Sequence, residues 1–182
     1  LEQTLADKPK CVGLAATAQL GEDDAHGGVL MHATGVVVGE RGVLLLGPPG
    51  SGKSDLALRM IMRSPGAICQ NAPRLICDDY VRLKLVQNEG CSSVSVEPGG
   101  DAIKGLLEVR GVGLVPVPYT EMADLSLVVE LVGPETVIER LPDDASTTVC
   151  VFGQPVRRLH IRPFEASAVD RILIAISQSN VS

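Results

Sequence analysis

The stretch that decides the fold reads Gly47-Pro48-Pro49-Gly50-Ser51-Gly52-Lys53-Ser54 and matches the pattern G-x-x-x-x-G-K-[ST] in full. Its glycines let the backbone wrap around an anion with the N–H groups pointing inward, and a following helix adds the positive end of its dipole. We expect Lys53 to reach the β- and γ-phosphates of a nucleotide and the Ser54 hydroxyl to ligate Mg²⁺. The stretch therefore predicts a phosphate-binding loop for a nucleoside triphosphate.

The residues on both sides of this loop have the pattern that a phosphate-binding loop requires. An apolar run at 43–46 predicts a strand before the loop. After it, Leu56, Ala57, Met60 and Ile61 recur at helical spacing, which predicts a helix over 53–63. The chain has 19 glycines, so a chance match is a real alternative. The strand–loop–helix order favours a functional loop.

The remainder of the chain has the pattern of a β-rich α/β domain with few helices. Apolar and β-branched runs bounded by turn residues predict further strands at 34–38, 74–77, 81–86, 93–96, 106–109, 113–117, 125–132, 147–152 and 156–161. A terminal helix is predicted at 165–177. Residues 1–28 lack a clear period and are interpreted as a tail or an edge element, which leaves 29–182 as one catalytic domain.

Two carboxylates follow the apolar run at 75–77, namely Asp78 and Asp79. A nucleotide site needs an acid at a strand end that holds the metal directly or through water. Successive strand residues point to opposite sides, so one Asp can face the metal and the other can face an incoming hydroxyl as a general base. The alternative is a solvated turn.

Other charged residues are candidates whose roles the spacing leaves open. His32 is either structural or part of the site. Glu108 and Arg110 flank Val109 on one face of a predicted strand, as a salt bridge or as a metal ligand with an arginine that steers phosphate. Arg140 and the arginines at 157, 158 and 162 are either solvated charges or a docking site for an acidic or phosphorylated partner.

Composition excludes several classes of function. The net charge of −6 and the four Phe and Tyr side chains argue against nucleic acid as a partner. No run approaches 18 apolar residues, so no membrane span is predicted. The five cysteines are odd in number and scattered without C-x-x-C, which argues against a disulfide framework or a zinc site. We expect free thiols and a cytoplasmic protein.

Taken together, these residues resemble the catalytic domain of the bacterial HPr kinase/phosphorylase family. Four stretches carry the resemblance: Met31-His32 before a β-hairpin, GPPGSGKSDLAL at 47–58, LICDD at 75–79 and LLEVRGVG at 106–113. The last is similar to the family signature E-[IV]-R-G-[LV]-G. The resemblance covers roughly residues 30–162 and is closest to the short form found in proteobacteria, which lacks the separate N-terminal domain of long members.

The resemblance implies a P-loop core related to phosphoenolpyruvate carboxykinase and ATP-dependent phosphorylation of a seryl hydroxyl on the phosphocarrier HPr of a phosphotransferase system. It implies that Ser54 and Glu108 take Mg²⁺ and that Asp79 accepts the seryl proton. His32 is similar to a histidine that lies beside this aspartate and tunes it. Arg140 is similar to a catalytic arginine that stabilises charge on the moving phosphoryl group.

The sequence also departs from the long members. No Gly-Arg-Asn follows residues 154–163, so the reverse reaction, dephosphorylation by inorganic phosphate, stays open, and so does a homo-oligomer. Two other functions are weighed. A nucleotide-binding regulatory module would keep the loop but would not need His32, Asp79, Glu108 and Arg140. A small-molecule kinase of the P-loop class would not need the E-V-R-G-V-G segment.

Overall fold

Continuous apolar runs form the centre of the sheet. They are β4 (Thr34–Val38), β5 (Arg41–Leu46) and β11 (Ala123–Leu131). Alternate residues of these strands face two different cores: Val43 and Leu45 belong to one, and Leu44 and Leu46 to the other. Both faces of these strands are therefore covered, which explains why their sequences are apolar at successive positions rather than at every second one.

The computed structural model describes residues 12–13, 20–23, 28–66, 69–88, 90–100, 104–144 and 146–178. In this part of the chain eleven strands form one sheet and two form a separate hairpin. The other strands of the sheet are β1 (Val12–Gly13), β2 (Leu20–Asp23), β3 (Val29–His32), β6 (Arg74–Cys77), β7 (Tyr80–Asn88), β8 (Cys91–Pro98), β12 (Thr148–Val151) and β13 (Gln154–Ile161).

Strand pairing places the loop at the edge where parallel strands end. β5 and β13 both pair with β11 in parallel, with Leu46 beside Glu130 and Ile161 beside Leu131. β4 lies antiparallel to β5 and to β6, so the end of β6 also lies near the loop. A parallel sheet with helices collects binding residues at the carboxyl ends of its strands.

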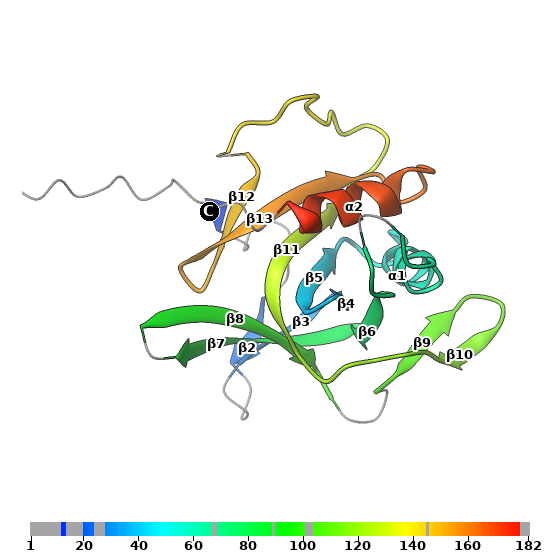
Figure 1. Cartoon of the computed structure of the whole chain (residues 1–182), viewed down its shortest axis with the longest axis horizontal. Coiled ribbons are helices and arrows are strands. Elements are labelled where there is room, and N and C mark those ends of the chain that lie inside the picture. The colour runs from blue at the N-terminus through cyan, green and yellow to red at the C-terminus, as the bar shows by residue number, and fades with distance from the viewer. Residues whose placement is uncertain are drawn as a thin grey trace, which may run out of the picture.

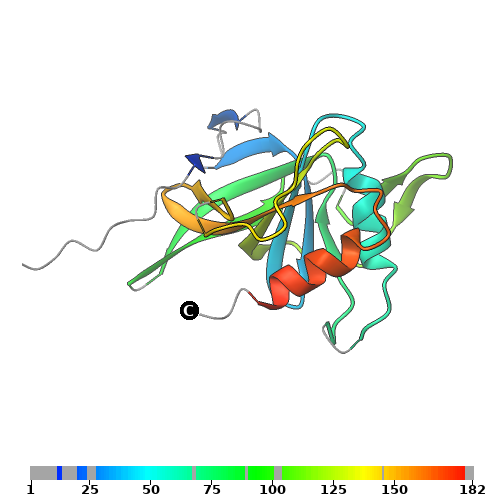
Figure 2. The ribbon, with the colours of Figure 1, turned by 90° about the horizontal axis from the view of Figure 1, so that it is seen from above.

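Two helices cover one core. The helix α1 (Lys53–Ile61) buries Leu56, Ala57, Met60 and Ile61, and α2 (Ala168–Ser177) buries an apolar face of its own. They contact each other and pack on the side of β5 and β11 that carries Val43 and Leu45 (Figures 1 and 2). Packing of amphipathic faces, rather than helix propensity, is the main source of stability for helices this short.

The separate hairpin consists of β9 (Leu106–Val109) and β10 (Gly113–Pro116), and it projects beside α1 (Figure 1). Gly111 in its turn and Gly113 at the start of β10 have φ of 82° and 111°, a conformation that residues with a side chain rarely adopt. Within the hairpin, Leu107 is fully buried in the core under α1 and Val109 packs against the same core, so β9 attaches the hairpin to the domain.

Most predicted elements are confirmed to within a few residues, and three differences have physical causes. The terminal helix begins at Ala168 rather than at 165, because residues 165–167 form turns in which Ala168 N–H bonds the carbonyl of Glu165. Arg110 lies in the hairpin turn instead of on the strand. β3 was not predicted, and its antiparallel pairing with β7 sets His32 opposite Tyr80. The predicted tail at 1–28 falls largely outside the described residues.

Candidate active site

The phosphate-binding loop runs from the end of β5 into α1. Gly50 and Gly52 have φ of 77° and 94°, which glycine adopts at no steric cost. Ser51 N–H bonds the Pro48 carbonyl at 3.1 Å and closes a turn inside the loop. At Gly47, an added Cβ would lie 2.5 Å from the Ser51 hydroxyl oxygen, so a side chain there would displace Ser51. The glycines of the motif are therefore required by the loop conformation itself.

Lys53 is the buried cation of the loop, with 6% of its surface exposed. Its ammonium group donates hydrogen bonds to the carbonyls of Gly47 at 3.0 Å and Pro48 at 3.3 Å. Burial lowers the pKa of Lys53, and the nearby charges of Asp79 and Asp78 oppose this shift. A phosphate oxygen would give the ammonium a charged partner in place of two neutral carbonyls, which is the stronger kind of hydrogen bond.

Asp78 is buried and connects three segments. Its Oδ1 accepts hydrogen bonds from the hydroxyls of Thr34 at 2.7 Å and Ser54 at 3.0 Å, and its Oδ2 faces the backbone N–H of Glu108 at 3.4 Å. It does not line the cavity described below. Asp78 therefore orients the Ser54 hydroxyl. Asp78 was predicted to hold Mg²⁺, and from this position it would do so indirectly, through Ser54 or a water molecule.

Asp79 follows β6, lines the cavity described below, and has a half-exposed side chain. Its φ of 66° is unusual for a residue with a side chain. The strain is held on both sides, because Tyr80 N–H bonds the Asp78 carbonyl at 2.8 Å and Ala33 N–H bonds the Asp79 carbonyl at 3.1 Å. Strained backbone of this kind is common at functional sites, and here it turns a carboxylate into the cavity.

His32 lies beside this carboxylate. Its Nε2 is 3.9 Å from Oδ1 of Asp79, and its ring meets the ring of Tyr80 edge to face with centroids 5.8 Å apart. The pairing of β3 with β7 produces this neighbourhood, because it sets residue 32 against the residue that follows Asp79. The ring therefore approaches the carboxylate in a fixed orientation.

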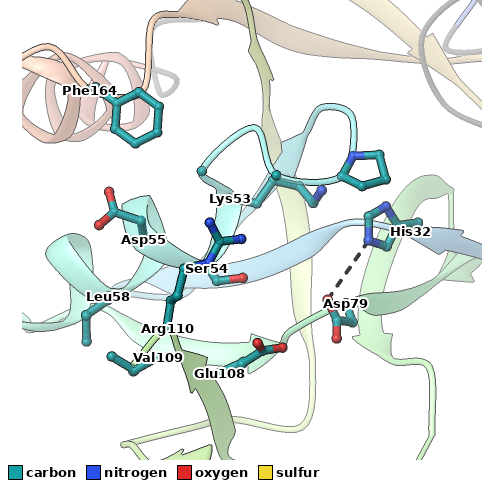
Figure 3. A pocket seen from close by; sticks show the side chains of 13 residues that line it. His32, Lys53, Ser54, Asp55, Leu58, Asp79, Glu108, Val109, Arg110 and Phe164 are labelled. Atoms are coloured by element: carbon teal, nitrogen blue, oxygen red, sulfur yellow. Dashed lines mark ion pairs between the residues drawn. The ribbon is translucent and has the colours of Figure 1, made fainter. Parts of the chain in front are cut away.

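One cavity of about 440 Å³ brings most of the predicted residues together (Figure 3). The loop and α1 contribute Lys53 and Ser54, the end of β6 contributes Asp79, and the β9–β10 hairpin contributes Glu108 and Arg110. His32 lies at the end of the cavity opposite Phe164 (Figure 3). A cation, a hydroxyl, a guanidinium and, with Asp55 included, three carboxylates thus face the same space. This set can neutralise a phosphate chain and hold a base beside it.

Some predicted residues lie elsewhere. Arg140 is exposed in the segment between β11 and β12 and does not line this cavity. The guanidinium groups of Arg157 and Arg158 bond the carbonyls of Ala175 and Ser146, so these two charges have structural partners. Among the residues that the structure describes, no group of three His, Cys, Asp or Glu side chains could hold a metal ion alone. Mg²⁺ usually needs only one or two protein carboxylates beside substrate phosphates.

Phe164 is one of the lining residues that the sequence analysis missed. Phe164 follows β13, is 74% exposed, and its ring stands 3.0 Å from the position of a Cβ added to Gly52. The chain has only two Phe residues, and Phe164 lies three residues after the end of a predicted strand. A rare aromatic side chain just after a strand was the signal that could have identified it.

Comparisons with known proteins show the family to which this domain is similar. The family described as HPr Serine kinase C-terminal domain matches residues 19–180. HPr kinase/phosphorylase of Burkholderia lata is 35% identical over 141 residues, which cover 72% of this chain and 39% of that protein. Its counterpart in Burkholderia cenocepacia is 37% identical over 130 residues, which cover 66% of this chain and 36% of that protein. The chain thus spans well under half the length of these curated relatives.

A solved structure has the same fold. The structure of the Hpr(Ser) kinase/phosphatase from Coxiella burnetii matches with a TM-score of 0.61 and 24% identity, over 81% of this chain and 87% of that one. The β-rich α/β fold expected from the resemblance is therefore confirmed. No helix in the described part of the chain is long and apolar enough to span a bilayer. Since the family match extends over far more than half of its residues, this chain belongs to the family of HPr serine kinase C-terminal domains.

Proposed function

We propose that this domain is an ATP- and Mg²⁺-dependent protein-serine kinase that phosphorylates an HPr-like phosphocarrier of a phosphotransferase system. The observation that carries the proposal is that the phosphate-binding loop and Asp79 line the same cavity. A loop that only senses nucleotide has no use for a carboxylate held opposite it in a strained conformation. The names of the curated relatives, HPr kinase/phosphorylase, support HPr as the acceptor.

The cavity suits a nucleotide and its metal ion. Ser54 and Glu108 offer hydroxyl and carboxylate oxygens, which are the ligands that Mg²⁺ prefers. When bound, Mg²⁺ would neutralise charge on the phosphates and help to align them. Lys53 would exchange its carbonyl partners at Gly47 and Pro48 for phosphate oxygens. Arg110, which points into the same space, would add a second positive charge (Figure 3).

The transfer itself would use Asp79. A seryl oxygen of the acceptor forms a bond to the γ-phosphorus while the bond from that phosphorus to the oxygen bridging to the β-phosphate breaks, so ADP leaves with the bridging oxygen. The proton of the seryl hydroxyl passes to the carboxylate of Asp79. His32, 3.9 Å from that carboxylate, would orient it and take part of its charge when protonated. Arg140 would have to approach from its present place for its predicted role.

The proposed setting is the cytoplasm, where ATP is available and thiols stay reduced. Cys69, Cys77 and Cys91 are free thiols in the structure, which supports this setting. A phosphorylase reaction is a second candidate because the names of the relatives include it. The same cavity would serve both directions, since Asp79 would return the proton to the seryl oxygen.

Mass spectrometry of purified HPr proteins after incubation with the domain, ATP and Mg²⁺ tests the proposal. We expect phosphorylation on one serine with the wild-type domain and none with Lys53→Ala or Asp79→Asn. Added inorganic phosphate then tests the reverse reaction in the same tube. If HPr stays unmodified while ATP still binds, the domain is a nucleotide-binding regulatory module instead.

A further inference from the structure

A second cavity, of about 570 Å³, lies against the other side of the phosphate-binding loop. Pro48 and Ser51 of the loop form one wall. The segments that follow β11 and β13 form the others and contribute mainly apolar groups, namely Leu131, Val132, Pro134, Pro163 and Phe164. Its size falls within the usual range for small-molecule sites, which are largely apolar with a few polar groups. Of the candidates outside the loop, Arg162 lines this cavity, whereas Asp79 and Glu108 do not.

Topology places this cavity where a ligand of the loop would extend. β5, β11 and β13 run parallel, and Leu46, Leu131 and Ile161 end them at the same edge of the sheet. The loop follows β5, and the cavity lies over the ends of its neighbours β11 and β13. Ligands of parallel sheets bind outside the carboxyl ends of the strands. Asp79, at the end of β6, lies on the β4 side of the loop strand instead.

Phe164 joins the two cavities. It lines both of them, and its ring packs on the backbone of Gly52 inside the loop. The side chain of Phe164 is 74% exposed, so most of its apolar surface is in water. A flat ligand stacked on the ring would bury that surface, which is favourable. A molecule with phosphates at Lys53 and an aromatic group beyond Gly52 would pass directly over this ring.

Two residues that line the second cavity, Ser51 and Arg162, each have a buried polar atom without a partner in the described part of the chain. The hydroxyl of Ser51 and Nε of Arg162 are buried with no hydrogen-bond partner among the described residues. The other nitrogens of Arg162 bond Glu165 at 3.2 Å and the Thr136 carbonyl at 2.9 Å, so its guanidinium is held in place. Buried polar groups without partners are uncommon and carry a cost that a bound ligand can remove.

We propose that this second cavity holds the base of the nucleotide whose phosphates occupy the loop. The proposal rests on the proposed function for the identity of that nucleotide. The base lies between the ends of β11 and β13 with Phe164 along its path, and the γ-phosphate extends the other way, toward Asp79 and His32. The competing arrangement puts the base against Leu58 and Val109, which are the apolar residues of the first cavity.

Calorimetry with two ligands tests the proposal without any protein acceptor. Inorganic tripolyphosphate carries only the phosphates, whereas ATP adds the ribose and the base. We expect ATP to bind the wild-type domain at least about tenfold more tightly than tripolyphosphate in the presence of Mg²⁺. We expect Phe164→Ala to remove most of that difference and leave tripolyphosphate binding unchanged. Phe152→Ala is the matched control, since Phe152 is an exposed phenylalanine at the opposite end of β13.

Methyl NMR locates the base directly. With methyl-labelled protein, we expect nuclear Overhauser effects between the adenine protons and the methyl groups of Leu131 and Val132. Contacts to Leu58 and Val109 instead would overturn the proposal. So would equal affinities for ATP and tripolyphosphate, or an equal loss of both in Phe164→Ala. These measurements need no phosphoryl transfer. The proposal for the base site can therefore be confirmed even if the kinase proposal fails, and it can fail even if the kinase proposal is confirmed.

Discussion

The hydroxyl of Ser54 donates a hydrogen bond to Oδ1 of Asp78 over 3.0 Å, so the residue expected to ligate Mg²⁺ is oriented by a carboxylate from the end of β6. The same oxygen accepts a hydrogen bond from the hydroxyl of Thr34 at 2.7 Å. Asp79, the next residue, makes no such contact with the loop and turns into the cavity instead. Two adjacent carboxylates therefore lie in different surroundings, which fits a positioning role for Asp78 and the proposed role in chemistry for Asp79.

The first prediction concerns the buried member of this pair. Asp78→Asn should lower the free energy of unfolding by about 1–3 kcal/mol, because an amide nitrogen would then oppose one of the donors that the carboxylate accepts. Urea denaturation measures this change. Asp79→Asn is the matched control and should change the unfolding free energy by less than about 0.5 kcal/mol, since the residue is exposed and Asn tolerates positive φ. Equal destabilisation by both variants would contradict the division of tasks.

The second prediction concerns the metal. Ser54→Ala removes the hydroxyl expected to ligate Mg²⁺, so the gain in ATP affinity on adding Mg²⁺ should shrink by about tenfold. Titration calorimetry with and without Mg²⁺ measures that gain. Thr34→Val is the control, because it deletes the other hydroxyl bonded to Asp78 but lies outside the cavity lining. The interpretation of Ser54 fails if Thr34→Val and Ser54→Ala reduce the Mg²⁺ effect equally.

The third prediction follows from the buried ammonium of Lys53, whose pKa burial lowers from an ordinary value of 10.5. Between the lowered pKa and 10.5, the unfolded chain binds more protons at this site than the folded domain. The contribution of Lys53 to the free energy of unfolding therefore rises with pH in that window. Below the window, the folded domain bears the full cost of burying the charged ammonium. Lys53→Met should remove this rise.

The same variant separates stability from function. At about pH 7, Lys53→Met should stabilise the domain by about 1 kcal/mol, because an apolar side chain of similar length has no charge to desolvate. It should also abolish nucleotide binding. Urea denaturation at about pH 7 and about pH 10 gives the stability, and calorimetry gives the binding. A less stable Lys53→Met domain would show that the bonds to the Gly47 and Pro48 carbonyls outweigh the cost of burial.

The fourth prediction concerns Arg140, which stays a predicted catalytic residue although it lies outside the cavity lining. If it approaches the phosphoryl group during transfer, Arg140→Ala should slow transfer about 100-fold or more and leave ATP affinity unchanged. Single-turnover kinetics and calorimetry separate the two quantities. Arg158→Ala is the control, because the side chain of Arg158 is held by the Ser146 carbonyl. An unchanged rate in Arg140→Ala would remove this residue from the mechanism.

The sequence predicted the parts of the site that depend on local pattern. The loop at 47–54, the strand before it and the helix after it follow from glycine spacing and periodicity, and the structure has all three. The strand at 74–77 also follows from local pattern, but Asp79 turns into the cavity through its φ of 66° and not through strand alternation. Whether Asp78 or Asp79 faces the loop depends on the pairing of β6 with β4, a contact between distant residues that periodicity does not report.

What local pattern could not predict depends on such distant contacts. His32 was expected beside Asp79 only through the family resemblance; it reaches Asp79 because β3 pairs with β7, and no pattern near residue 32 indicates that strand. Phe164 reaches Gly52 because β13 lies two strands from β5 in a parallel arrangement. Short strands of four residues carry little periodic signal, so their pairing could not be read from residues 29–32 alone.

The most direct test is the fate of the γ-phosphate in a single turnover with HPr, comparing the wild-type domain with Asp79→Asn at saturating ATP and Mg²⁺. We predict phosphoseryl HPr from the wild type, a rate at least about 100-fold lower in Asp79→Asn, and equal ATP affinity in both. Equal transfer rates in the two proteins would exclude Asp79 as the base. Release of inorganic phosphate without phosphorylated HPr from the wild type would contradict the kinase itself.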